Sequence, residues 1–117
     1  MNTDIENRVS GIDAAALTDF CRRVRAALGD GLVELRLFGS KARGDAGPDA
    51  DIDVLVVIDA PGGRWPLAGT VSDVAFDVNL EHAVFISPIV VTTSMLSEEG
   101  WRRSPLMRAV RAEGVRL

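Results

Sequence analysis

Two aspartates separated by a single residue, Asp51 and Asp53, stand at the start of the most apolar segment of the chain, residues 52–58. An apolar, β-branched run of this length is typical of a strand that is buried on both faces. Because side chains alternate along a strand, both carboxylates point to the same face. Two like charges so placed repel each other, and the arrangement is costly unless a cation or protons compensate them. Mg²⁺ prefers carboxylate oxygens together with phosphate and water, so the pair predicts a Mg²⁺ site.

A glycine and a serine, Gly39 and Ser40, follow an earlier strand-like segment. The glycine lets the backbone approach a phosphate closely, and its amide and the serine hydroxyl can donate to phosphate oxygens. Arg43 is in reach of the same phosphates, whereas Lys41 lies on another helical face and is expected to be a solvated surface charge. Taken singly, each feature has a simpler alternative: a plain turn, a solvated arginine, or aspartates that face water.

The combination resembles a known signature. Gly39–Ser40, ten intervening residues and Asp51–Ile52–Asp53, within the string GSKARGDAGPDADIDVLVV, resemble the minimal nucleotidyltransferases of the DNA polymerase β-like superfamily. The resemblance implies a mixed β-sheet flanked by helices. It also implies that Gly39 and Ser40 bind the phosphates of ATP or a similar nucleotide, and that Asp51 and Asp53 coordinate Mg²⁺. Chains of this size resemble the antitoxin of HEPN–MNT toxin–antitoxin pairs, which can transfer AMP to a tyrosine of the HEPN toxin.

One departure from the family pattern concerns catalysis. The family usually carries a third carboxylate on the following core strand, but here that strand reads VFISPIVVTT, with Ser87 nearest the expected place. A serine is not a base at neutral pH. Asp77 and Glu81 precede this strand and are expected on a solvated helix face. Two hypotheses follow: an enzyme that adenylylates a hydroxyl of a HEPN toxin, or a degenerate antitoxin that neutralises its toxin by binding alone.

The acceptor of such a transfer must lie outside this chain if it is a tyrosine, because the chain contains none. Transfer to a small molecule is disfavoured, since 117 residues provide little beyond the nucleotide core to enclose such a substrate. Dimerisation could supply the missing enclosure. The sequence leaves the oligomeric state open, self-association included.

The elements that position these residues follow an α/β order. Apolar spacing of three and four predicts helices, and alternation or β-branched runs predict strands. Pro88 cannot donate a ladder hydrogen bond, which predicts an edge position or a bulge for the third strand. Ser104 and Pro105 are typical of a helix start. The expected order is a helix over 12–28, a strand over 32–38 with Val33, Leu35 and Leu37 inward, a helical turn over 41–44, a strand over 52–58, a loop over 59–66 anchored by Trp65, a helix over 68–81, a strand over 84–91 and a helix from 105 that stops at Gly114.

Three further residues have two interpretations each. The only cysteine, Cys21, lies among apolar residues and is expected to be a buried thiol. The only histidine, His82, is expected to be a polar surface residue without metal-ligand neighbours. Trp101, beside Arg102 and Arg103, forms either a partner-binding patch or a cap on the core.

Length and composition limit the number of domains and the classes of function that the chain can have. A chain of 117 residues is expected to form one domain, residues 1–117. The net charge of −4 and a pI of about 4.9 argue against a general nucleic-acid binder. No apolar run approaches the roughly 20 residues of a membrane span, and no signal-peptide pattern begins the chain. We therefore expect a cytoplasmic protein.

Overall fold

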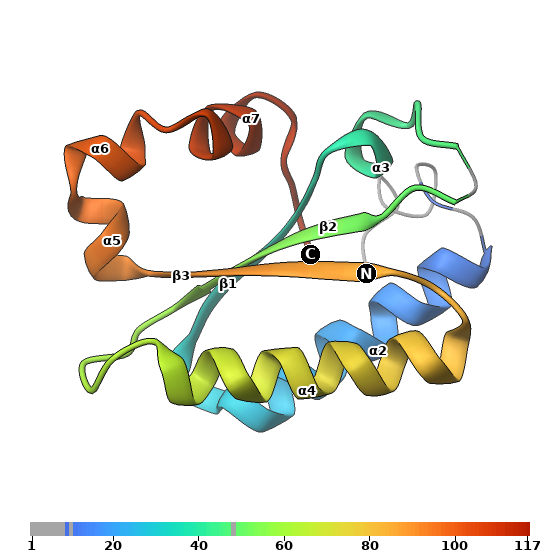
Figure 1. Ribbon diagram of the computed structural model, residues 1–117, viewed down its shortest axis with the longest axis horizontal. Coiled ribbons are helices and arrows are strands. Elements are labelled where there is room, and N and C mark those ends of the chain that lie inside the picture. Colours follow the sequence, from blue (N-terminus) through green and yellow to red (C-terminus); the bar gives the residue numbers. More distant parts are fainter. Residues whose placement is uncertain (1–8, 10, 48) are drawn as a thin grey trace.

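The computed structural model describes residue 9, residues 11–47 and residues 49–117. Four strands form one sheet with the order β3-β2-β1-β4, flanked by helices (Figure 1). The sheet is mixed, because β1 pairs antiparallel with β2 and β4 while β2 pairs parallel with β3. The expected α/β fold is confirmed. The elements in chain order are α2 (Gly11–Leu28), a 3-10 turn (Gly29–Gly31), β1 (Leu32–Phe38), α3 (Ser40–Arg43), β2 (Ile52–Ile58), α4 (Trp65–His82), β3 (Ile86–Thr92), α5 (Thr93–Ser97), α6 (Glu99–Arg102), α7 (Pro105–Glu113) and β4 (Val115–Arg116).

Strand β2 is the centre of the molecule. Every residue of it except Asp53 is buried. One set of its side chains packs with α2 and α4, and the alternate set, Leu55 and Val57, packs with the C-terminal segment. Asp53 alternates with the first set, so its side chain belongs to the face that the C-terminal segment covers.

Helices α2 and α4 lie side by side beneath the sheet (Figure 1). Their inward stripes form the larger apolar cluster, in which Phe20 and Leu17 are fully buried. Cys21 is buried in this cluster as expected, and burial raises the pKa of its thiol to about 11. This thiol therefore stays protonated at neutral pH. Among the described residues, no helix combines the length and the apolar character needed to cross a membrane.

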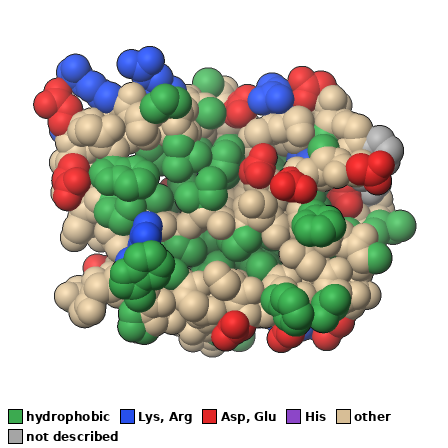
Figure 2. All heavy atoms as spheres, viewed as in Figure 1, with side chains coloured by type: hydrophobic (Ala, Val, Ile, Leu, Met, Phe, Trp, Pro, Cys, Tyr) green, Lys and Arg blue, Asp and Glu red, His purple; other side chains and the backbone are tan. Residues whose placement is uncertain are grey.

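The other face of the sheet is covered by the C-terminal segment. Two short helices, α5 and α6, and the two-residue strand β4 were not expected from the sequence. The Thr92 hydroxyl accepts from the Met95 amide at 3.0 Å and begins α5, and the predicted Ser104 cap of α7 is confirmed. Trp101 is half-buried and packs against the second apolar cluster, which supports its interpretation as a cap on the core. Figure 2 shows hydrophobic side chains gathered between this segment and β3.

Three local expectations need correction or completion. Val33 is exposed rather than inward, because the β1–β2 register shifts between Leu32 and Glu34 and breaks the alternation there. Trp65 does not anchor a loop: it begins α4 and is 74% exposed, with the Arg64 guanidinium over its ring. Strand β3 runs unbroken through Pro88 and occupies an edge of the sheet, as the proline predicted.

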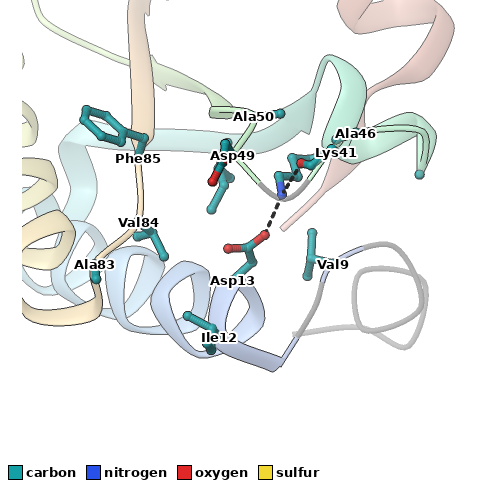
Figure 3. A pocket seen from close by; sticks show the side chains of 13 residues that line it. Val9, Ile12, Asp13, Lys41, Ala46, Asp49, Ala50, Ala83, Val84 and Phe85 are labelled. Atoms are coloured by element: carbon teal, nitrogen blue, oxygen red, sulfur yellow. Dashed lines mark hydrogen bonds and ion pairs between the residues drawn. The ribbon is translucent and has the colours of Figure 1, made fainter.

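Lys41 is the largest departure from the sequence-based expectation. Instead of facing solvent it is buried, and its ammonium contacts Oδ2 of buried Asp13 at 2.7 Å (Figure 3). The same ammonium donates to the Gly47 carbonyl at 3.4 Å. A buried charge is tolerated only with such partners, so the ion pair ties α3 to the first turn of α2.

Replacing Lys41 by Met removes this tie and is expected to lower the free energy of unfolding by about 3 kcal/mol, since it strips a buried carboxylate of its ion-pair partner. Urea unfolding followed by circular dichroism measures the change. Arg103→Met is the matched control, because Arg103 pairs with Glu99 at 3.1 Å on an exposed surface. The control is expected to change stability by less than about 0.5 kcal/mol. Equal losses in the two variants would contradict the structural role of Lys41.

Candidate functional site

The register of β1 and β2 brings the two halves of the sequence signature together. Phe38 pairs with Asp53, so Gly39, the next residue, lies beside the Asp53 carboxylate. A Cβ atom at Gly39 would stand 2.3 Å from Asp53 Oδ2, closer than any side chain allows. Gly39 also has a φ of 77°, a conformation that favours glycine. The backbone turn therefore requires the glycine, and any larger residue would also push the Asp53 carboxylate aside.

The electrostatics at this point are unfavourable for negative charge. Burial raises the pKa of Asp53, and the nearby charges of Asp51 and Glu113 raise it further. Asp51 is exposed and precedes β2, while Asp53 is half-buried within it. Carboxylates that repel one another in a partly desolvated site provide the oxygen donors that a divalent cation prefers. The donor set of Asp51 and Asp53 therefore fits Mg²⁺.

Glu113 is a site residue that the sequence reasoning did not select. It is the last residue of α7, and its carboxylate accepts from the Gly39 amide at 3.2 Å and from Arg43 Nη1 at 2.9 Å. The one available signal was that Glu113 is the only acidic residue in an otherwise basic C-terminal stretch, residues 102–117. That signal gave no information about where the carboxylate lies.

The remaining predicted residues differ in their surroundings. Ser40 is half-buried and starts α3. Arg43 is 46% exposed, and besides Glu113 it contacts Asp45 Oδ2 at 3.1 Å. Lys41 points away from the site, toward Asp13. The structure thus brings Gly39, Arg43 and Asp53 together through Glu113 and removes Lys41 from consideration as a phosphate ligand.

The third core strand offers no acidic residue in the place where the family carries one. Ser87 pairs with Asp53 in the parallel register of β2 and β3, so their side chains share a face. Asp77 and Glu81 are both exposed and lie on α4, which covers the opposite face of the sheet. Neither α4 residue therefore takes the place of the missing carboxylate.

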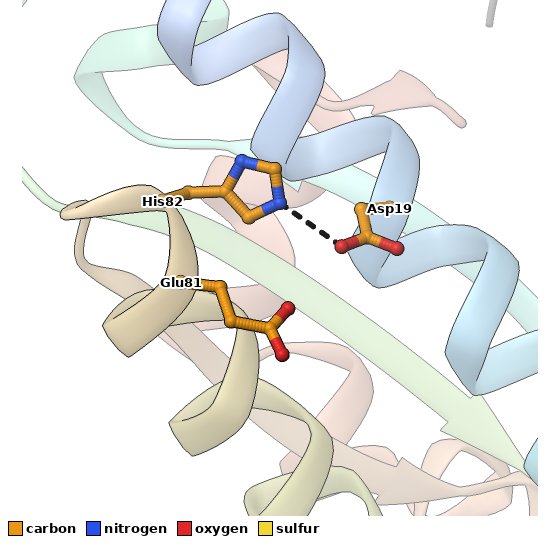
Figure 4. Close-up of side chains that lie close together, drawn as sticks. All are labelled: Asp19, Glu81 and His82. Carbon is orange, nitrogen blue, oxygen red and sulfur yellow. Dashed lines mark hydrogen bonds and ion pairs between the residues drawn. The ribbon is translucent and has the colours of Figure 1, made fainter.

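A second group of ionisable side chains joins α2 to α4. One ligand atom from each of Asp19, Glu81 and His82 lies within 4.8 Å of the others (Figure 4). His82 thus has neighbours of metal-ligand type, contrary to expectation. His82 Nε2 lies 3.0 Å from Asp19 Oδ2, and Arg22 and Arg23 also bind Asp19. These contacts, the histidine contact first among them, lower the pKa of Asp19 to about 2, so the group is an interhelical ion-pair network.

A cavity of about 730 Å³ lies next to the predicted site but does not include it. Its walls come from the start of α2, the loop before β2 and the segment that follows α4 (Figure 3). The Lys41–Asp13 ion pair is part of the wall, while Gly39, Asp51 and Asp53 are not. The cavity residues are Val9, Ile12, Asp13, Lys41, Gly44, Ala46, Gly47, Asp49, Ala50, Ile52, Ala83, Val84 and Phe85.

Comparison with known proteins identifies the family. Residues 17–98 match the model of the nucleotidyltransferase domain, so the chain belongs to that family. A protein of Methanocaldococcus jannaschii described as a putative protein adenylyltransferase is 33% identical over 82 residues, which cover 69% of this chain. The chain spans only 56% of the length of that relative.

Two solved structures share the fold. One, described as a toxin–antitoxin with AMP-PNP, superposes with a TM-score of 0.57 at 15% identity and covers 83% of this chain and 68% of its own. The other, described as a putative minimal nucleotidyltransferase, has a TM-score of 0.50 at 25% identity and covers 87% of this chain and 95% of its own. The mixed sheet with flanking helices is therefore that of a minimal nucleotidyltransferase.

The close approach of Gly39 to Asp53 can be tested with a matched pair of glycines. Gly44 has a φ of 80°, like the 77° of Gly39, but a Cβ there would meet nothing within 4 Å. Gly44→Ala is expected to lower stability by about 1–2 kcal/mol, the usual cost of a left-handed φ, and Gly39→Ala by more, because the φ of 77° and ψ of −160° at Gly39 are a combination that is essentially restricted to glycine. Only Gly39→Ala is expected to shift the ¹³C resonance of the Asp53 carboxyl group. Equal shifts in the two variants would rule out the contact.

Proposed function

We propose that this chain transfers AMP from ATP to a hydroxyl group of a partner protein, with the HEPN ribonuclease toxin of a toxin–antitoxin pair as that partner. The observation that carries the proposal is the contact of Gly39 with Asp53, which joins a phosphate-binding glycine to a carboxylate pair at the head of β2. Membership of the nucleotidyltransferase family supports the reaction class. The relative's description supports a protein as acceptor.

Each residue has a role that its position supports. Gly39 presents its amide, Ser40 its hydroxyl and Arg43 its guanidinium to the phosphate oxygens of the nucleotide. Asp51 and Asp53 hold Mg²⁺, which supplies charge neutralisation at the phosphates when bound. Together these groups fix the α-phosphorus for in-line attack, in which the acceptor oxygen bonds to phosphorus and pyrophosphate leaves. Catalysis by such a site consists mainly of positioning and charge stabilisation.

A toxin as the partner is supported by a structural neighbour. The structural neighbour described as a toxin–antitoxin with AMP-PNP is alike in fold, and its description names both a toxin partner and an ATP analogue. The ATP analogue in that description also supports ATP as the nucleotide.

A second function is favoured by one specific observation. No acidic residue occurs on β3, where Ser87 pairs with Asp53, so this strand provides no general base. In this second function the chain neutralises its toxin by covering it, without transfer of AMP. The two functions differ in their dependence on Asp51 and Asp53.

Label transfer separates the two functions. Purified protein, Mg²⁺, α-labelled ATP and a HEPN ribonuclease toxin are expected to give labelled toxin, while γ-labelled ATP gives none because pyrophosphate leaves. The double variant Asp51→Asn with Asp53→Asn is expected to lose label by roughly 10²-fold or more. Asp30→Asn with Asp59→Asn is the matched control, since both residues are exposed and lie outside the site.

Two results would contradict AMP transfer by this site. If a stable complex forms with no label from any nucleoside triphosphate, and the Asp51 and Asp53 double variant still neutralises the toxin in a growth assay, then neutralisation occurs by binding alone. Label that persists in the double variant would instead exclude these two aspartates from the transfer site.

A further inference from the structure

The carboxylate of Glu113 binds the same two groups that the proposed function assigns to the nucleotide. The Gly39 amide donates to Oε1 at 3.2 Å, and Arg43 Nη1 donates to Oε2 at 2.9 Å. The Glu113 side chain is 19% exposed, so these hydrogen bonds are partly shielded from water. A carboxylate and a phosphate accept from a backbone amide and a guanidinium in the same manner.

The Gly39 amide has one hydrogen and its bond to Glu113 uses it. A phosphate oxygen at this position needs the same hydrogen. We propose that the Glu113 carboxylate occupies a phosphate position of the nucleotide site and that a nucleoside triphosphate must displace it to bind. The inference rests on the proposed function, because it takes Gly39 and Arg43 as phosphate ligands.

The backbone around Glu113 is fixed, so the side chain is the part that moves. Before it, Met107 and Val110 of α7 are buried in the second apolar cluster. After it, Gly114 turns so tightly that a Cβ there would lie 2.3 Å from the Val110 carbonyl oxygen. Val115 then pairs with Leu37 of β1. Displacement therefore needs only a rotation of the Glu113 side chain, without unfolding of α7.

The Glu113 carboxylate also repels the charge of Asp53. Burial raises the pKa of Asp53, and the charge of Asp51 raises it further. The charge of Glu113 acts in the same direction, although Glu113 itself is paired with Gly39 and Arg43. Figure 2 shows acidic side chains gathered at the end of the molecule where α3 lies. A ligand that replaces Glu113 at the two donors removes one of these repelling carboxylates from the site.

The competing interpretation is that Glu113 replaces the family's third carboxylate and assists binding or transfer. The two interpretations predict opposite signs. If Glu113 competes with phosphate, its removal strengthens nucleotide binding, whereas if it assists, its removal weakens binding or leaves binding intact and lowers transfer. Its engagement by both phosphate donors favours competition.

The test is the affinity for a non-hydrolysable ATP analogue with Mg²⁺, measured by isothermal titration calorimetry. Glu113→Gln is expected to bind the analogue roughly tenfold more tightly than the wild type, because the substitution weakens a competing charge-assisted hydrogen bond. Glu113→Ala, which removes the acceptor altogether, is expected to gain at least as much. Glu99→Gln is the matched control: it also loses one carboxylate that pairs with an arginine, but on α6, at the other end of the long axis from α3 (Figure 1).

An amide spectrum checks folding and the contact together. The ¹H–¹⁵N resonance of Gly39 is expected to shift in Glu113→Gln and in the nucleotide-saturated wild type, but not in Glu99→Gln. The gain in affinity is expected to persist at high salt, since a long-range charge effect would be screened.

Each outcome decides the question. Unchanged or weaker binding by both Glu113 variants, with binding by the wild type, overturns the inference and leaves the proposed function standing. An equal gain in Glu99→Gln also overturns it, because net charge then explains the effect. Absence of nucleotide binding in the wild type and in every variant refutes the nucleotide site itself, and the inference with it.

Discussion

The antiparallel register of β1 and β2 is the constraint on which the candidate site depends. It sets Phe38 opposite Asp53, and the chain then turns at Gly39 directly against the Asp53 carboxylate. The register is strongly specified, because a slip by one residue would move Leu35 and Leu37 out of the core. A sheet that must bury β2 on both faces therefore fixes the distance between the glycine turn and the aspartate pair.

The same burial explains why the site lies at an end of the sheet. Alternate residues of β2 serve two apolar clusters, one with α2 and α4 and one with the C-terminal segment. A charged side chain is excluded from the middle of such a strand. Asp53 is accommodated because it is the second residue of β2, at the margin of the second cluster, where it remains half-buried. The buried Lys41–Asp13 pair fixes the neighbouring turn of α3 from the other side.

The sequence predicted the parts of this arrangement that local patterns encode. The bounds of β1 and β2 and the cap of α7 followed from periodicity and from turn chemistry. Contacts between distant segments did not follow, because spacing carries no information about them. Lys41 resembles a surface residue until the start of α2 folds against it, and Glu113 resembles a lone acid in a basic tail until β4 returns α7 to β1. The exposed Val33 depended on a register shift that no pattern in one strand reveals.

The charge balance of the site links these features to its chemistry. The charges of Asp51 and Glu113 both act on Asp53, while only Glu113 is paired with Arg43 and the Gly39 amide, so negative charge is in excess around Asp53. Glu113 comes from the end of α7, whereas Asp53 belongs to β2 and Asp51 directly precedes it. The Glu113 carboxylate is therefore the one of these three that can leave without disturbing β2. Under the proposed function, a cation and a phosphate chain that arrive together would balance this excess, because the cation would compensate the aspartates while the phosphates would take over the donors that Glu113 releases.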